Sequence, residues 1–322
     1  MRKEYYLKSP VIASSGLLGF SGEGWWFHKL IIFLTLNFPW VTFQTKTVTA
    51  NKREGNLKEG EKNPKCVSIN PWPFKAYAVN NISLTNKGIK AYIDDWRKLK
   101  GEVHLSIMTI EKDKKQRMAD LRKLVYFLQK YLKDNKADKV ILHYNVFCPN
   151  TGENVAKYFS ILKEEIIFLK KKLEIDLFLK VGWDFPVDIA KDLEEFVDGF
   201  DAINTIPFNK IAPYKQKRYF KKGENVNYIS PLDKHQDSFK IKGRGGVSGR
   251  PLRYFALRWI RDARKAGITK YIIGGGGILR PIHVFKFKVA GANAISPGSI
   301  VFLRPHHLIP VILTAKLIFK KY

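Results

Sequence analysis

One stretch of this chain gathers residue types that can do chemistry, the sequence His143-Tyr144-Asn145-Val146-Phe147-Cys148-Pro149-Asn150. Proline fixes its own φ and restricts the residue before it, so Cys148 is held on a rigid turn. The amides of Asn145 and Asn150 carry both donors and acceptors and suit a ligand that has both. This spacing predicts a functional site, and a buried cysteine that only packs is the alternative for Cys148.

The elements around this stretch place its polar residues at the end of a strand. Residues 139–142 form an alternating apolar run that predicts a β-strand. Parallel α/β barrels carry their catalytic groups at the C-terminal ends of such strands. Other polar residues also follow predicted strands or lie in a loop that does, and we expect all of them to converge on one face: Lys46, Asn80, Asn145, Cys148, Lys180, Asn204 and Thr205.

Strand and helix patterns alternate along nearly the whole chain. Strands are predicted over residues 9–16, 41–45, 103–108, 139–144, 176–181, 201–206, 270–273 and 292–296. Helices are predicted over residues 23–36, 89–98, 115–133, 155–173, 187–195, 252–266, 280–290 and 308–319. Eight such units favour an α/β fold of the (β/α)8 TIM-barrel type over a doubly wound sheet, with residues 1–322 as one domain.

Two irregular segments interrupt the alternation. Residues 55–86 are rich in Asn, Pro, Gly and Lys, which predicts an inserted excursion after the second strand. A long loop follows the sixth strand and runs to Gly249. Both insertions leave strand ends, so we expect them to lie above the working face of the barrel.

Glycine-rich segments mark the last third of the chain. Glycines 243, 245, 246 and 249 precede one predicted helix, Gly274-Gly275-Gly276-Gly277 precedes the next, and Ser296-Pro297-Gly298-Ser299 follows the last strand. Backbone N–H groups at helix N-termini bind anions, and the loops after the seventh and eighth strands are the usual phosphate site of a barrel. These segments predict a phosphorylated cofactor, with ordinary turns as the alternative.

Composition sets the wider limits. The formal net charge of +28 would draw the protein towards nucleic acid, acidic lipid or anionic small molecules, but lysines along residues 112–136 and 157–172 fit the solvated sides of amphipathic helices. The two cysteines, Cys66 and Cys148, stand far apart, which argues against a disulfide framework or a metal or iron-sulfur site and fits a reducing cytoplasm. The most apolar runs are too interrupted for a membrane span.

Taken together, these stretches resemble the dihydroorotate dehydrogenase family of FMN enzymes from about Ser9 to the final strand. Cysteine at position 148 is similar to the soluble class 1 enzymes, whereas the membrane-associated class has serine there and an N-terminal helical extension that we do not expect here. The resemblance rests on Ala13-Ser14-Ser15-Gly16, Lys46, Arg53-Glu54-Gly55-Asn56, Asn80, Leu84-Thr85-Asn86-Lys87-Gly88, Asn145 to Asn150, Lys180, Asn204-Thr205, Gly245-Gly246-Val247-Ser248-Gly249 and Gly276-Gly277.

The resemblance implies a role for each group. Cys148 would be the base that takes a proton from C5 of dihydroorotate, while a hydride leaves C6 for N5 of the flavin. Lys180 would stabilise negative charge near flavin N1 and O2. The implied substrate-binding residues are Lys46, Asn80, Asn145, Asn150, Asn204 and Thr205. The implied FMN-binding residues are Ser14, Ser15, Gly16, Lys46, Asn145, Lys180, Gly245, Gly246, Gly276, Gly277, Gly298 and Ser299.

Three residues depart from the family pattern and keep a different dihydropyrimidine open as the substrate. His143 stands where the family usually has an acidic residue, Phe147 where it has a small hydroxyl residue, and Ser83 where it often has glycine. The implied partners besides dihydroorotate are a second copy of the chain or an electron-transfer subunit with iron-sulfur and FAD groups. The electron acceptor stays open between fumarate, NAD and another compound.

Two other functions compete with this one. The tRNA dihydrouridine synthases are flavin barrels that also carry Asn-x-x-Cys-Pro, and a basic surface would suit tRNA. Asn150, the Arg53-Glu54-Gly55-Asn56 segment and the Gly-Gly-x-Ser-Gly loop belong instead to the dehydrogenase pattern, so nucleic acid is not the expected partner. A flavin barrel that only binds is the third possibility, and the presence of Cys148 and both lysines argues against it.

Overall fold

A curled parallel sheet forms the centre of the computed structural model, which describes residues 7–19, 40–58, 61, 64–146, 155–211, 213–223 and 228–319. Its strand order is β1-β4-β5-β6-β7-β10-β11. The bounds are β1 (Phe43–Gln44), β4 (Gly101–Ile107), β5 (Ala137–Asn145), β6 (Asp176–Val181), β7 (Gly199–Ala202), β10 (Tyr271–Gly275) and β11 (Ala294–Ser296).

The first apolar segment of the chain closes this sheet into a barrel. Val11 forms a parallel bridge with Ile295 of β11, and Ile12 forms one with Thr42, which precedes β1. Ile12 N donates to Ile295 O and Ala13 N donates to Thr42 O, both at 2.9 Å. The segment therefore lies between the first and last strands as the eighth member of the ring, which confirms the predicted (β/α)8 barrel.

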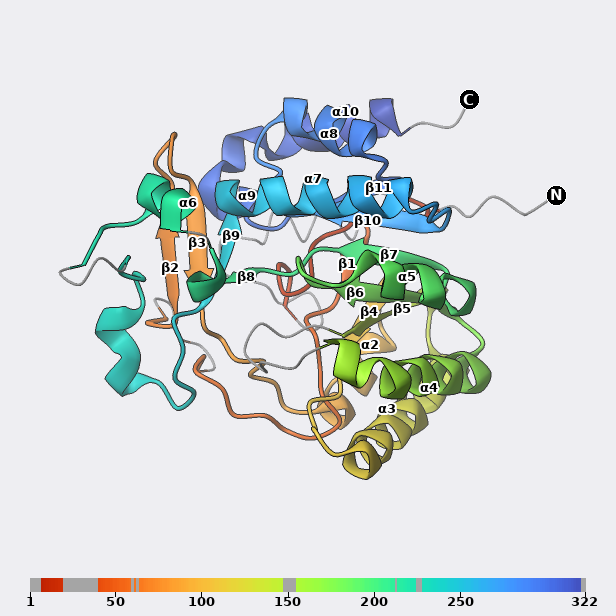
Figure 1. Cartoon of the computed structure of the whole chain (residues 1–322). Coiled ribbons are helices and arrows are strands. Elements are labelled where there is room, and N and C mark those ends of the chain that lie inside the picture. Colours follow the sequence, from red (N-terminus) through yellow and green to blue (C-terminus); the bar gives the residue numbers. More distant parts are fainter. Residues whose placement is uncertain are drawn as a thin grey trace.

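Helices cover the outside of the barrel, with α3 and α4 on one side and α7, α8 and α10 on the other (Figure 1). Asp113 is the N-cap residue of α3. Its side chain accepts a hydrogen bond from Gln116 N at 3.0 Å, which satisfies one of the free N–H groups of the first turn. The bounds are α3 (Lys114–Asp134), α4 (Val155–Leu173), α5 (Val187–Leu193), α7 (Arg250–Lys265), α8 (Pro281–Ala290) and α10 (Leu308–Ile318).

Some predicted elements differ from the structure. The helix expected over residues 89–98 is a 3-10 turn, Ile89–Ala91, followed by the short α2 (Ile93–Trp96), because Tyr92 between them has a φ of −112°. The strand expected over residues 201–206 ends at Ala202. Two short helices, α6 (Pro213–Tyr219) and α9 (Ile300–Leu303), were not predicted. The helix expected over residues 23–36 lies outside the described residues.

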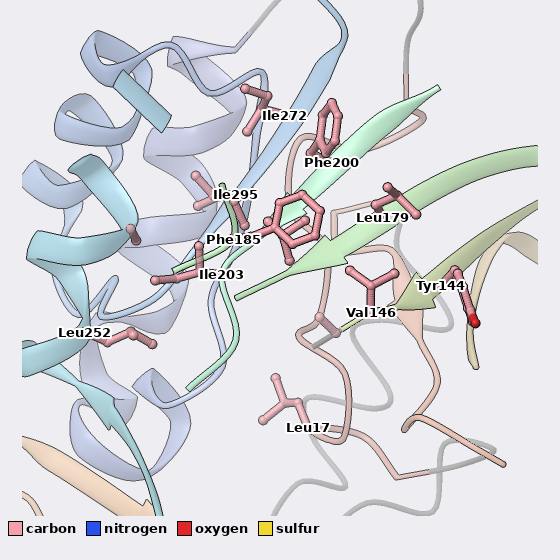
Figure 2. Close-up of a cluster of buried hydrophobic side chains, with 14 of the residues drawn as sticks. Leu17, Tyr144, Val146, Leu179, Phe185, Phe200, Ile203, Leu252, Ile272 and Ile295 are labelled. Atoms are coloured by element: carbon pink, nitrogen blue, oxygen red, sulfur yellow. The ribbon is translucent and has the colours of Figure 1, made fainter. Parts of the chain in front are cut away.

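Alternation along the strands separates two apolar layers. On β6, Leu177 and Leu179 belong to the large core between strands and helices, whereas Phe178 belongs to a second cluster with Ile12, Ile141, Ile273 and Ala294 inside the barrel. Figure 2 shows members of the outer core on four neighbouring strands, namely Tyr144, Leu179, Phe200 and Ile272. Residues one position away from these therefore point into the barrel, and several of them are polar.

A second, antiparallel sheet stands beside the barrel (Figure 1). Its order is β2-β3-β9-β8. It combines a hairpin from the insertion after β1 with two strands from the insertion after β7, and β8 begins only four residues after β7 ends, which places the sheet at the C-terminal ends of the barrel strands. The bounds are β2 (Val67–Asn70), β3 (Tyr77–Asn80), β8 (Ile206–Pro207) and β9 (Gly246–Gly249).

Candidate functional site

A cavity of about 1920 Å³ lies between the strand ends of the barrel and the small sheet. Its walls come from the loops after the strands and from both insertions, as expected for the working face of a barrel. It brings together the following predicted site residues: Ser14, Ser15, Gly16, Lys46, Asn80, Asn145, Lys180, Asn204, Thr205, Gly276, Gly277, Gly298 and Ser299. Segments up to 285 positions apart thus converge on one space.

Four residues of the segment from Asn145 to Asn150, which we expect to carry the chemistry, lie outside the described residues. These are Phe147, Cys148, Pro149 and Asn150. Asn145, at the end of β5, belongs to the same motif and lines the cavity. The role of Cys148 as a base therefore stays a prediction.

The end of the first strand meets the loop after the last one. Ser14 Oγ donates to Ser296 O at 2.8 Å. A Cβ on Gly298 would stand 2.9 Å from the Ser14 Cβ atom, closer than side chains approach. Small residues are needed at both positions because the two loops touch where the barrel closes.

Lys46 lies between the first strand and the inserted excursion. Its Nζ donates to Thr85 O at 3.2 Å, and a Cβ on Gly16 would lie 3.6 Å from its Cγ atom. In the same excursion Ser83 has a φ of 59°, in the left-handed region that favours glycine. Its Oγ donates to Asn81 Oδ1 at 2.8 Å, which supports serine in that conformation.

Two amides meet on the cavity wall. Asn204 Nδ2 donates to Asn145 Oδ1 at 2.9 Å, which links the loop after β7 to the end of β5. This bond fixes the two amides relative to each other, so the pair offers both donors and acceptors to a ligand. Asn80 faces the same space from the end of β3.

Gly246 begins strand β9 of the small sheet and Gly245 directly precedes it, and the nearest contacts of both are with protein. A Cβ on Gly246 would stand 2.3 Å from Thr205 Oγ1, and a Cβ on Gly245 would stand 2.8 Å from side-chain atoms of Leu232 and Val79. Glycine is therefore required here for packing. Ser248 of the same strand lines the cavity, and a cofactor contact of the two glycines stays a prediction.

The loop after β10 rests on the first turn of α7. A Cβ on Gly277 would stand 2.4 Å from Gly249 O, and Gly277 has a φ of 71°. Arg253 in that first turn donates from Nη1 to Gly277 O at 3.1 Å. Only glycine lets the loop approach so closely, and the backbone N–H groups of a loop beside a helix N-terminus suit an anion.

Lys180 brings a buried cation to the cavity wall. Its Nζ lies 3.1 Å from Asp201 Oδ2, and His143 Nδ1 lies 3.1 Å from the same oxygen. Burial alone would raise the pKa of Asp201, but the Lys180 charge and the His143 hydrogen bond outweigh it and hold that pKa below its usual value. The carboxylate is therefore ionised at neutral pH and keeps Lys180 in place.

Sequence reasoning missed Asp201 as a site residue, although it lines the cavity. The signal was a charged side chain in the apolar strand β7, where a strand buried on both faces normally carries apolar residues. His104 in β4 gives the same signal: it is fully buried, and its Nδ1 lies 2.7 Å from His143 Nε2.

A model of the protein family described as dihydroorotate dehydrogenase matches residues 3–314. The chain belongs to the dihydroorotate dehydrogenase family. This result favours the dehydrogenase over the synthase interpretation of the Asn-x-x-Cys-Pro motif. Within the described residues, the helices are too short or too polar to cross a membrane.

Curated relatives cover nearly the whole chain. The catalytic subunit of dihydroorotate dehydrogenase B (NAD(+)) from Caldicellulosiruptor bescii is 26% identical over 93% of this chain and 86% of the relative. The protein of the same name from Thermoanaerobacter pseudethanolicus is 28% identical over 95% of this chain and 88% of the relative. Among solved structures, ligand-free dihydroorotate dehydrogenase from Eimeria tenella has a TM-score of 0.64 at 17% identity and covers 96% of this chain and 83% of that one, which supports the fold.

Proposed function

We propose that this protein is an FMN-dependent dehydrogenase that oxidises dihydroorotate to orotate in pyrimidine biosynthesis. The observation that carries the proposal is the cavity itself, in which a buried lysine, an asparagine pair and glycine loops meet at the C-terminal end of a barrel of this family. A rigid arrangement of such groups is what orientation of two reactants requires.

The glycine loops and Lys180 fit a phosphorylated flavin. Gly276, Gly277, Gly298 and Ser299 would hold the phosphate, because glycine leaves their backbone N–H groups accessible to an anion. Lys180 would lie at the ring and balance negative charge there. Bound FMN would supply the hydride acceptor. The remaining residues proposed for the cofactor are Ser14, Ser15, Gly16, Lys46, Asn145, Gly245 and Gly246.

Neutral amides would bind the substrate. Asn145 and Asn204 are held together by a hydrogen bond, and such groups pair with the carboxylate and amide edges of a pyrimidine without leaving a buried charge when the site is empty. Lys46, Asn80, Asn150 and Thr205 complete the proposed set. Cys148 would take the proton from C5, a transfer that a positioned thiolate can perform.

Anaerobic titration tests this function directly. The purified protein, loaded with FMN, should lose its flavin absorbance as dihydroorotate is added. The variant Cys148→Ser should keep its flavin but be reduced roughly a hundredfold more slowly or worse, because a serine hydroxyl is a far weaker acid than a thiol. A flavin band that persists in excess dihydroorotate would refute the substrate. Equal reduction rates for both proteins would refute the base.

The relatives suggest where the electrons go next. Because they are named as catalytic subunits of an NAD(+) enzyme, we infer that this chain passes electrons to a separate subunit with iron-sulfur and FAD groups. The isolated chain should then oxidise dihydroorotate with an artificial dye but not with NAD. Rapid NAD reduction by the isolated chain would contradict the inference.

A further inference from the structure

Five buried polar side chains run through the barrel as one hydrogen-bonded series, here named the relay chain. It begins at Glu102 and His104 on β4, passes to His143 on β5 and Asp201 on β7, and ends at Lys180 on β6. Glu102 Oε1 lies 3.2 Å from His104 Nε2, His104 Nδ1 lies 2.7 Å from His143 Nε2, and Asp201 Oδ2 lies 3.1 Å from both His143 Nδ1 and Lys180 Nζ.

The number of protons on the two rings follows from these contacts. A 2.7 Å separation of two ring nitrogens requires one proton between them, since two lone pairs would repel. The outer nitrogens of His104 and His143 each face a carboxylate, which when ionised has no proton to donate and can only accept a hydrogen bond, so each outer nitrogen carries a proton. Three protons are therefore shared by two imidazoles, and one ring carries a positive charge.

Burial decides which ring that is. It lowers the pKa of His143 to about 4, against the opposing effect of the Asp201 hydrogen bond, so His143 is the neutral ring. His104 then carries the charge beside Glu102. Burial would raise the pKa of Glu102, but the His104 contact outweighs it and the pKa lies below its usual value. The relay chain thus contains two ion pairs in sequence, Glu102 with His104 and Asp201 with Lys180.

The two ends of the relay chain lie in different surroundings. Lys180 and Asp201 line the cavity. Glu102, near the start of β4, accepts a hydrogen bond from Lys8 N at 3.0 Å, and the Lys8 side chain is half exposed at the opposite end of the barrel. The relay chain therefore spans the barrel from its cavity to the neighbourhood of solvent at the other end.

Few other polar groups of the described residues face the relay chain. Gln44 from β1 donates to Asp201 Oδ2 at 3.4 Å, and Thr42 donates to Glu102 Oε1 at 3.4 Å. Lys139 from β5 and Tyr271 from β10 interact electrostatically with Glu102. These groups act on Glu102 and Asp201 and not on the two rings, so a proton between the rings responds chiefly to the relay chain itself.

We propose that the relay chain shifts its protons one position towards the cavity when negative charge develops beside Lys180, and shifts them back when that charge leaves. The proposal rests on the proposed function, which supplies the charge through the reduced flavin. The shift would compensate that charge at the cavity wall, where charges interact more strongly than in bulk water.

Each proton moves along an existing hydrogen bond, and no electron or heavy atom moves. His143 Nδ1 gives its proton to Asp201, His104 Nδ1 gives its proton to His143 Nε2, and Glu102 ends beside a neutral His104. One positive charge is thereby carried from His104 to Asp201, next to the cavity. The total number of protons is unchanged.

The rings are fixed, which makes the shift reversible and prevents continuous conduction. His143 stacks on Phe178 with ring centroids 5.5 Å apart and an interplanar angle of 18°, and both imidazoles are fully buried. A ring that cannot rotate cannot reset its tautomer by turning. It resets only when the proton returns along the same path, as a charge that comes and goes in a redox cycle would require.

Two measurements test the relay chain. In the protein without flavin, nitrogen NMR of labelled histidine should show one neutral and one doubly protonated ring that are coupled to each other. In the FMN-loaded protein reduced with dithionite, the infrared difference spectrum should show imidazole and carboxylic acid bands that appear on reduction and vanish on reoxidation. His143→Gln and Asp201→Asn should lose these bands. Tyr144→Phe, on the outer face of the same strand, should keep them.

The outcomes separate this proposal from the function on which it rests. If the FMN-loaded protein is reduced and these infrared bands do not appear, the proton shift is refuted and the proposed function is not. The same holds if the bands persist in His143→Gln. Two neutral rings in the NMR spectrum would also overturn it. A protein that takes up no FMN would overturn both proposals. Reduction by dithionite needs no substrate, so failure of dihydroorotate as a substrate would leave the infrared result decisive.

Discussion

His143 and Tyr144 are neighbours on β5, yet they anchor two buried polar networks on opposite faces of the barrel wall. His143 points inward and belongs to the relay chain. Tyr144 points outward, and its hydroxyl donates to Glu165 Oε2 on α4 at 2.7 Å. Glu165 Oε1 accepts from Arg117 Nε on α3 at 2.9 Å. Each network pairs a buried cation with a buried carboxylate.

The two networks differ in where they end. In the outer network Arg117 also donates to Thr109 Oγ1 at 2.8 Å and to Glu111 O at 2.9 Å, and these contacts tie two helices to the strand ends. The inner network ends at Lys180, on the cavity wall. In a buried ion pair that closes on itself, each charge is needed mainly to balance the other, whereas a buried pair that opens on a cavity also sets the electrostatic potential felt by a ligand.

Arg117→Ala should have the largest effect and should act on stability. It leaves the buried Glu165 carboxylate without its cation, and breaking such a pair typically costs about 3–5 kcal/mol. Denaturant unfolding would measure this loss. The FMN dissociation constant of the molecules that remain folded should hardly change. The double variant Arg117→Met with Glu165→Leu should recover much of the stability, because no charge is then left buried. A double variant as unstable as the single one would contradict this account.

The outer elements of this comparison could be predicted from sequence, and the inner network could not. The bounds predicted for α4, residues 155–173, agree with the structure because a long amphipathic period is a local signal. The pairing of Ile12 with Thr42, and the meeting of His104 with His143, join distant segments and depend on the closed ring. Each of these residues looks like an isolated side chain in the sequence.

The candidate site shows the same division. Residues near the C-terminal ends of predicted strands, such as Lys180 and Asn204, line one cavity as expected, because strand direction alone brings their positions together. Asp201 was missed because its partners lie on other strands. Gly245 and Gly246 belong to the segment expected as a phosphate loop, but β9 begins at Gly246 and pairs with β3 and β8, so packing at this sheet explains both glycines without a ligand.

His143→Gln should reduce the pH dependence of stability. The pKa of His143 falls from 6.5 to about 4 on folding, so the unfolded chain binds the proton first. The stability is therefore fully present above pH 6.5 and is lost as the pH falls towards 4, by up to about 3 kcal/mol. The free energy of unfolding, measured between pH 4 and pH 6.5, should change less with pH in the variant than in the unmodified protein.

A second histidine, outside the barrel, sharpens that measurement. His283 on α8 accepts from Leu279 N at 3.0 Å, and burial together with the charge of Arg253 lowers its pKa to about 3. His283→Gln should also reduce the change of the unfolding free energy with pH. The effects of the two substitutions should add because the two histidines share no partner. An unchanged slope in His143→Gln would mean that this ring is already protonated in the folded protein.

Lys180→Met should weaken FMN binding roughly tenfold to a hundredfold, because a hydrogen bond to a charged group is worth about 1.5–3 kcal/mol. Lys170→Met is the matched control. Lys170 also pairs with an aspartate, Asp198, at 2.7 Å, but it lies at the end of α4 and is about one-third exposed. The control should keep its FMN affinity and lose less than about 1 kcal/mol of stability. Similar affinities for both variants in a flavin titration would remove Lys180 from the cofactor site.

Tyr144→Phe should have the smallest effect, and it tests whether the two faces of β5 are independent. The change removes one hydroxyl that donates to Glu165, while the Arg117 contacts of that carboxylate remain, so the loss should be near the ordinary value of about 1 kcal/mol for a hydrogen bond. Thr109 Oγ1, 2.6 Å from the hydroxyl, keeps its bond from Arg117 Nη2. The pH slope and the FMN affinity should match those of the unmodified protein, because the inner network does not touch this side chain. A change in either one, measured beside His143→Gln, would mean that the barrel wall transmits charge or strain from its outer face to the cavity.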